Sequence, residues 1–291
     1  MPLNEYPFDG SWGYQCSGYF SATSRYGSAQ ELMYLINACH RANIGIIMDF
    51  VPVHFVRDDF SLSYFDGTPL YEYEKACDAD SQWGTANFNL WREEVRSFLM
   101  SAAAFWIDKY HVDGLRMDAI SNIIHWHGNK DLGENEGALH FIKRMNYHLS
   151  EAYKGVMLIA EDSSDFANVT KATQDGGLGF DYKWDLGWMN DTLKYLEKDP
   201  IYRKWHHNNI TFSMAYFYSE RFIMEFPMMR WYMERKPSSI RYGAAMRKSS
   251  HSCGPCIYIC SRIRARSSIL WEMNWRISVS GMKKSSATGI C

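Results

Sequence analysis

The sequence lacks any apolar run that approaches the roughly 18 residues of a membrane span, and residues 1–10 contain no apolar segment typical of a secretion signal. Its cysteines also lack the regular spacing of a disulfide framework. Cys16, Cys39 and Cys77 are scattered through residues 1–223, and the other four follow residue 250. Scattered thiols are typical of a reducing compartment, so we expect a cytoplasmic protein with no membrane partner.

Aspartate is absent from residues 224–291, and this absence marks a change in composition. Residues 1–223 contain 19 Lys and Arg against 30 Asp and Glu, a net charge of −11. Residues 224–291 contain 12 against 3, a net charge of +9, and they show no helix or strand period. We therefore expect an ordered domain over residues 1–223 and an irregular, poorly packed tail over residues 224–291.

Residues 1–223 contain short apolar strands that alternate with amphipathic helices. The apolar runs predict strands at residues 44–50, 112–118, 156–160 and 179–184. Helical periodicity predicts helices that begin after the capping box of Ser28 and Glu31 and at residues 95–106, 139–149 and 186–196. Strands and helices in this alternation form βαβ units, so we predict an α/β fold with a parallel sheet.

Three successive predicted strands run into a carboxylate, namely Asp49, Asp118 and Glu161. In an α/β barrel the carboxyl ends of the strands line the active site, so these three side chains are expected to converge. Arg116 precedes Asp118 by two residues and therefore points to the same side of its strand. An ion pair that merely closes the strand is one interpretation of this spacing. The other is a site in which the guanidinium keeps Asp118 ionised and oriented.

An ionised, oriented carboxylate is the nucleophile that retaining glycosyl transfer requires. The same mechanism needs a second carboxyl group about 5 to 5.5 Å away as general acid and base. Glu161 follows a wholly apolar strand, a setting that favours the protonated form of a carboxyl group. We therefore predict Asp118 as nucleophile and Glu161 as acid/base, with Asp49 or His54 binding the sugar hydroxyls.

Several stretches of the sequence resemble the α-amylase superfamily. Residues 49–55 (DFVPVHF), 114–119 (GLRMDA) and 160–164 (AEDSS) are similar to its first three signature regions. Further similarity to the glycogen branching enzymes of that superfamily lies in WGYQ at residues 12–15, DDF at 58–60, GGLGF at 176–180 and YKW at 182–184. The resemblance extends from about residue 7 to about residue 223, and within it Val53 and Asp162 replace a Gly and a Glu that the family usually has.

The resemblance implies a (β/α)8 barrel, of which this chain would hold about strands 3 to 6. It implies an enzyme that cleaves α-1,4 bonds in an α-glucan and forms α-1,6 branches, with no metal or organic cofactor and no nucleic-acid partner. It also implies Asp118 as the nucleophile and Glu161 as the general acid/base. The residues implied to line the donor-sugar subsite are Tyr14, Asp49, His54 and Arg116.

The fourth signature region of that family, His-Asp-Glu-Val-Val-His-Gly, is missing after residue 223, as are the two barrel strands that the family places before residue 7. Residues 227–235 can be written CCC ATG ATG AGG TGG TAC ATG GAA AGG. Read from the last base of the first codon, that string becomes CAT GAT GAG GTG GTA CAT GGA, which encodes the missing motif. Our hypothesis is that the tail is an out-of-frame translation from about residue 224, and we expect this chain to be inactive or nearly so.

Two other functions remain open at the level of sequence. The first is an α-glucan hydrolase of the same superfamily. The second is a non-catalytic protein whose tail binds zinc through Cys253, Cys256 and Cys260 or nucleic acid through its arginines. We favour an unselected tail over a binding tail, because a zinc site needs a fourth ligand and a surrounding fold.

Overall fold

The computed structural model describes residues 1–225 and Ile269–Leu270. Most of the expected tail, including its cysteines and arginines, lies outside the described residues. Within the described part, no helix is both long and apolar enough to span a bilayer.

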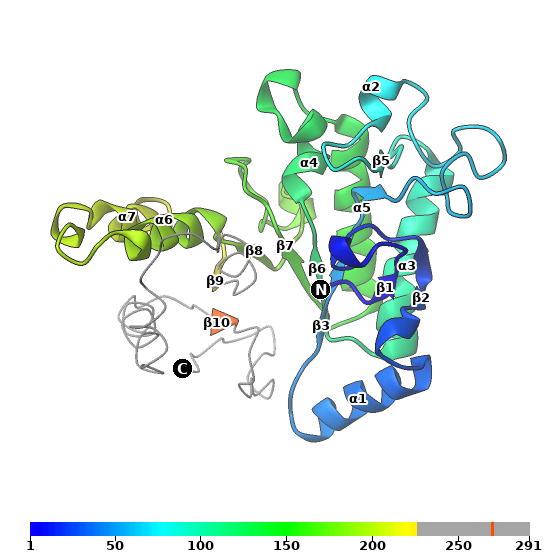
Figure 1. Cartoon of the computed structure of the whole chain (residues 1–291), viewed down its shortest axis with the longest axis horizontal. Coiled ribbons are helices and arrows are strands. Elements are labelled where there is room, and N and C mark those ends of the chain that lie inside the picture. Colours follow the sequence, from blue (N-terminus) through cyan, green and yellow to red (C-terminus); the bar gives the residue numbers. More distant parts are fainter. Residues whose placement is uncertain (226–268, 271–291) are drawn as a thin grey trace.

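A parallel sheet runs through the structure in the order β10-β9-β8-β7-β6-β3 (Figure 1). Its strands are β3 (Ile47–Phe50), β6 (Gly114–Met117), β7 (Met157–Ala160), β8 (Tyr182–Trp184), β9 (Phe222–Glu225) and β10 (Ile269–Leu270). From β3 to β9 each strand pairs with the next sheet strand along the chain, as in an α/β barrel. The predicted α/β fold with a parallel sheet is therefore confirmed, and β9 is a further strand that the sequence patterns did not predict.

Four longer helices occupy the positions that the apolar periodicity predicts. They are α1 (Ala29–Arg41), α3 (Glu93–Tyr110), α5 (Glu136–Ala152) and α6 (Leu186–Glu197). The predicted capping box is present: Ser28 accepts a hydrogen bond from the Glu31 backbone, and the Glu31 carboxylate accepts one from the Ser28 backbone. A cap of this kind satisfies two of the N–H groups that every helix start leaves free.

Shorter elements connect these units. Two antiparallel pairs are formed by β1 (Asn4–Glu5) with β2 (Gly18–Ala22) and by β4 (His54–Phe55) with β5 (Ala86–Asn87). The short helices are α2 (Ala76–Ala79), α4 (Ile120–Ile124) and α7 (Asn208–Thr211). Single 3-10 turns lie at η1 (Asp9–Ser11), η2 (Ser24–Tyr26), η3 (Trp126–Gly128), η4 (Lys130–Leu132), η5 (Thr173–Asp175), η6 (Arg203–Trp205) and η7 (Phe212–Ala215).

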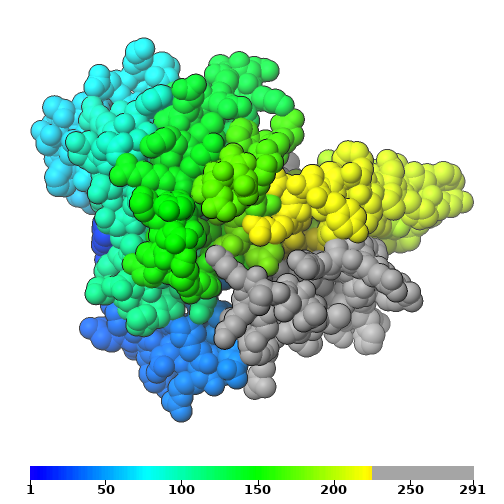
Figure 2. All heavy atoms as spheres, turned by 180° about the vertical axis from the view of Figure 1, so that it is seen from behind, coloured from blue at the N-terminus to red at the C-terminus, as the bar shows by residue number. Residues whose placement is uncertain are grey.

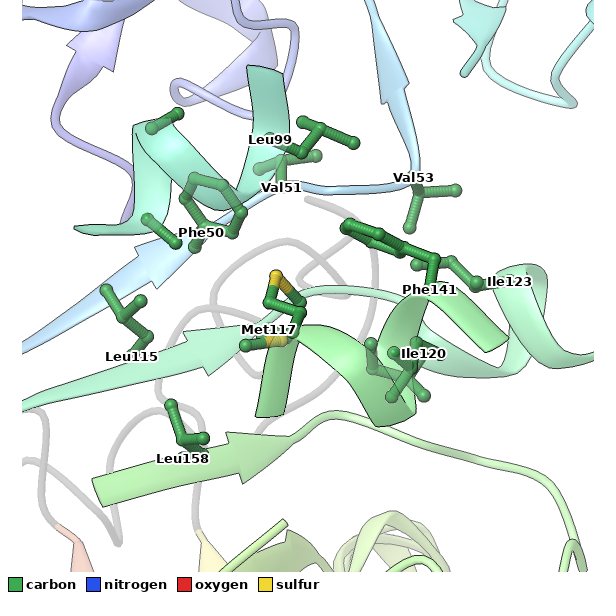
Figure 3. Packing of buried hydrophobic residues seen from close by; sticks show 14 of the residues in the cluster. Phe50, Val51, Val53, Leu99, Leu115, Met117, Ile120, Ile123, Phe141 and Leu158 are labelled. Carbon is green, nitrogen blue, oxygen red and sulfur yellow. The ribbon is translucent and has the colours of Figure 1, made fainter. Parts of the chain in front are cut away.

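The main hydrophobic core lies between the sheet and the helices α3, α4 and α5. On β6, Leu115 and Met117 are fully buried in this core, together with Leu158 of β7 (Figure 3). Leu99 of α3 and Phe141 of α5 pack on the same core. Because side chains alternate along a strand, this packing leaves residue 116 and its equivalents on the opposite face of the sheet, where the site is built.

Close contact between β6 and β7 requires a glycine. A Cβ atom at Gly114 would lie 2.7 Å from the carbonyl oxygen of Met157, which is closer than real Cβ contacts allow. Gly114 pairs with Met157, and the ladder continues to Met117 opposite Ala160. This register brings the residues that follow the two strands, Asp118 and Glu161, side by side.

A second region, which we call the arm, comprises residues 186–221. It contains α6, α7 and η7, and it projects sideways from the rest of the described chain (Figures 1 and 2). Its own small core is formed by Trp188, Met189, Leu193 and Phe217, with Met224 of β9.

Candidate active site

Arg116 lies at the centre of the candidate site and is almost completely buried. Its Nη1 atom is 2.9 Å from Oδ1 of Asp118 and 3.3 Å from Oδ2 of Asp49, and its Nη2 atom is 2.9 Å from Oε2 of Glu161. One guanidinium therefore holds the three carboxylates that end β3, β6 and β7. Three anions that converge in a buried place need such a counter-ion, because burial of an unpaired charge is very unfavourable.

Backbone hydrogen bonds extend the strand register to the catalytic candidates. The Asp118 amide donates to the Phe50 carbonyl (2.9 Å), and the Glu161 amide donates to the Met117 carbonyl (2.9 Å). Ala119 then turns into the left-handed region at φ 48° and ψ 44° and directs its own N–H to Oε2 of Glu161 (3.1 Å). A left-handed residue that is not glycine costs about 1–2 kcal/mol, and such strain concentrates at functional sites.

Asp118 and Glu161 are close enough to share a hydrogen bond. Burial raises the pKa of Asp118 well above its usual value; Arg116 opposes this rise, and the charges of Glu161 and Asp49 add to it. Arg116 thus favours the ionised form of Asp118, as expected, but burial and the neighbouring carboxylates outweigh its effect on the pKa.

Tyr14 and Asp49 form the side of the site next to β3. The Tyr14 hydroxyl donates to Oδ2 of Asp49 (2.9 Å) and lies 3.3 Å from Nη1 of Arg116. Burial opposes ionisation of Asp49, but Arg116, the amino group of Met1 and the Tyr14 hydrogen bond hold its pKa below the usual value. Asp49 is therefore an anionic hydrogen-bond acceptor beside the catalytic candidates, as binding of sugar hydroxyls requires.

His54 lies at the start of β4 and packs against Trp83, with the ring centroids 4.9 Å apart. Burial lowers the pKa of His54 to about 4, so its imidazole is neutral at pH 7. Of the six predicted site residues, the structure thus groups four around a fifth, Arg116, and places His54 against Trp83. Trp83 is 41% exposed and offers an aromatic surface that the sequence reasoning did not assign.

Two neighbours in β8 were also missed as site residues. Trp184 covers the guanidinium of Arg116, with the central carbon 4.1 Å from the ring centroid, a cation–π geometry. Lys183 forms an ion pair with Asp162, with Nζ and Oδ2 2.8 Å apart. Both residues lie at the end of a predicted strand, which was the available signal. This strand also runs into a carboxylate, Asp185, but Asp185 accepts a hydrogen bond from the Trp188 amide at the start of α6.

The positions of Asp118 and Glu161 fit a reaction that is catalysed by two carboxyl groups. Within residues 1–225, no three His, Cys, Asp or Glu side chains form a group that could hold a metal ion. Asp118 and Glu161 each lie 2.9 Å from a nitrogen of the same guanidinium, and a retaining mechanism uses two carboxyl groups that lie close together.

Comparison with known proteins agrees with this class of site. The family model of the alpha amylase catalytic domain matches residues 81–184. A Salmonella typhimurium protein described as an alpha amylase has a similar fold, with a TM-score of 0.60 and 20% sequence identity over 77% of this chain and 41% of that chain. The chain belongs to the α-amylase family, glycoside hydrolase family 13, and its described sheet is part of that family's barrel.

Within that family, the similar curated proteins are 1,4-alpha-glucan branching enzymes. The enzyme GlgB of Fusobacterium nucleatum is 55% identical over 225 residues, and that of Geobacillus stearothermophilus is 52% identical over 227 residues. These matches cover 77% and 78% of this chain. The chain spans 36% of the length of each of these relatives.

Proposed function

We propose that this chain is the catalytic part of a 1,4-α-glucan branching enzyme, which cleaves an α-1,4 bond and transfers the cut segment to a 6-hydroxyl group. The observation that supports it most is the placement of Asp118 and Glu161 on one buried guanidinium, Arg116, at the ends of neighbouring parallel strands. The substrate is an α-1,4-glucan such as glycogen or amylose, and the proposed compartment is the cytoplasm.

In the proposed first step, a carboxylate oxygen of Asp118 attacks the anomeric carbon of the donor glucose. The glycosidic bond breaks as Glu161 gives its proton to the leaving 4-oxygen, and the cut segment stays covalently bound to Asp118. In the second step Glu161 takes the proton of an acceptor 6-hydroxyl, whose oxygen displaces Asp118 from the anomeric carbon. Both steps invert the anomeric centre, so the α configuration is retained.

The remaining site residues have proposed binding roles. Asp49 and Tyr14 are placed to hydrogen-bond the hydroxyl groups of the donor sugar, and the neutral His54 can do the same. Arg116 balances the negative charge of the carboxylates throughout both steps. No metal or organic cofactor is required in this scheme.

The test is an assay for new α-1,6 linkages in amylose, with the product chains debranched and sized. We compare this chain with a variant in which the reading frame after residue 223 is changed to restore His-Asp-Glu-Val-Val-His-Gly. The barrel strands expected before residue 7 and after this motif are added to the same variant. We expect branching by the restored protein, loss of branching in its Asp118→Asn form, and little or no branching by the present chain.

Other results of this assay would contradict the proposal. Release of reducing ends without new α-1,6 linkages would identify a hydrolase instead. Turnover by the present chain equal to that of the restored protein would disprove the expectation that residues 224–291 are an out-of-frame tail.

A further inference from the structure

The ladder between β7 and β8 ends just before the proposed acid/base. It consists of two residue pairs, Ile159 with Tyr182 and Ala160 with Lys183. Glu161 directly follows β7, and no pair of this ladder includes it. Its side-chain position relative to β8 therefore depends on contacts beyond the ladder.

A buried ion pair provides such a contact one residue further on. Nζ of Lys183 lies 2.8 Å from Oδ2 of Asp162, and the two side chains are 7% and 0% exposed. The same Nζ donates to the Ser164 carbonyl (2.9 Å), and the Ser164 amide donates to Oδ1 of Asp162 (2.9 Å). These three contacts hold residues 162–164 against β8.

The alternation of side chains relates this ion pair to the site. Glu161 and Trp184 both contact Arg116, whereas their neighbours Asp162 and Lys183 contact each other. The ion pair therefore lies on the opposite side of the same two chain segments. Separation of Lys183 from Asp162 would release the segment that carries Glu161 from the strand that carries Trp184.

We propose that the buried ion pair of Lys183 and Asp162 positions Glu161 against Asp118 and Arg116, so that both residues are positioning residues of the branching reaction. This inference rests on the proposed function only in the roles given to Asp118 and Glu161. The geometry itself can be tested in the present chain without turnover.

The experiment follows the titration of Asp118 by carbon-13 NMR in protein labelled at the aspartate carboxyl carbon, with the signal assigned from Asp118→Asn. The charged and titratable groups that interact with Asp118 are Arg116, Glu161, Asp49, Tyr14, Cys16 and Tyr19. In Lys183→Met we expect Glu161 to move away from Asp118. The titration midpoint of Asp118 then falls by about one pH unit, because a neighbouring negative charge is lost.

A double variant separates positioning from stability. Lys183→Met alone leaves a buried carboxylate without its counter-ion and lowers the melting temperature, whereas Lys183→Met with Asp162→Asn removes both charges and recovers much of it. We expect the Asp118 midpoint to stay shifted in the double variant. The matched control is Lys130→Met, which removes an exposed ion pair with Asp165 and should leave the midpoint unchanged.

An unchanged Asp118 midpoint in the folded double variant would overturn the inference, whether or not Lys183→Met folds. A shifted midpoint supports it. If the midpoint shifts but the frame-restored protein makes no α-1,6 linkages, the positioning inference stands and only the proposed function fails.

Discussion

The helices behind the catalytic strands and the helices of the arm differ in how much of their surface is covered. On α3, eight residues are buried, from Val95 to Tyr110. On α6 four residues are buried, and on α7 none. The arm instead exposes several large apolar side chains: Ile201, Tyr202, Trp205, Phe212, Met214 and Tyr218.

The more densely packed of these two regions is the one that supports the catalytic candidates. Asp49, Asp118 and Glu161 end the three strands that α3 and α5 support, and a densely packed support holds side chains in one rotamer. Strand β8, which precedes the arm, contacts Arg116 through Trp184 and Asp162 through Lys183. We expect substitutions near the site to cost far more stability than substitutions in the arm.

The largest effect should come from Arg116→Met. Removal of the shared counter-ion leaves Asp49 and Asp118 buried without compensation, and we expect a loss of about 4 kcal/mol in the free energy of unfolding at pH 7. In this variant the native state binds more protons than the unfolded state, so its stability falls as the pH rises. Urea unfolding at pH 5 and pH 8 measures both effects; equal losses at the two pH values would show that the carboxylates are not the cause.

The next effect compares the two cores directly. Phe141→Ala removes a fully buried ring of the main core and should cost about 3–4 kcal/mol. Leu193→Ala in the arm core should cost about 2 kcal/mol, at the low end of the range for buried leucine, because Leu193 is 7% exposed. Urea unfolding followed by circular dichroism measures both. Equal losses would contradict the difference between the two regions.

The smallest effect concerns the buried His54. Its pKa is about 4 in the native state and about 6.5 when unfolded, so the unfolded state binds more protons between these values. Stability is then lost as the pH falls from about 6.5 towards 4, by about 2 kcal/mol between pH 7 and pH 5. We expect His54→Gln to lack this part of the pH dependence. The measurement is the difference between the unfolding free energies of wild type and variant at both pH values.

Much of the fold was predictable because its signals are local. The capping box before α1, the apolar period of α5 and the apolar run of β7 each depend on residues close in sequence. Strand β9 was missed because its apolar run of three residues, Phe222 to Met224, is too short to show a clear period. The convergence of Asp49 and Asp118 was predictable from the rule that parallel strands end at one face.

The parts of the site that were missed depend on contacts between distant segments. Trp184 contacts Arg116 from 68 positions away, and no spacing within the sequence indicates that pair. The effect of Arg116 on the pKa of Asp118 could be predicted from their spacing, whereas the opposing effects of burial and of Glu161 come from other segments. Local patterns identified which side chains face the site, whereas their charge states required the packed structure.

The consecutive strand order has a consequence for how the chain is made. In the parallel sheet, β6, β7, β8 and β9 each pair with the sheet strand that the ribosome makes before them, so each unit can join the sheet as soon as it emerges. Such neighbour-by-neighbour assembly keeps the closing loops short, which favours rapid folding. A change in the message after codon 223 therefore follows the synthesis of β3, β6, β7 and β8 and does not alter their pairing. In such a nascent chain Asp49, Asp118 and Glu161 would converge before the altered residues are made.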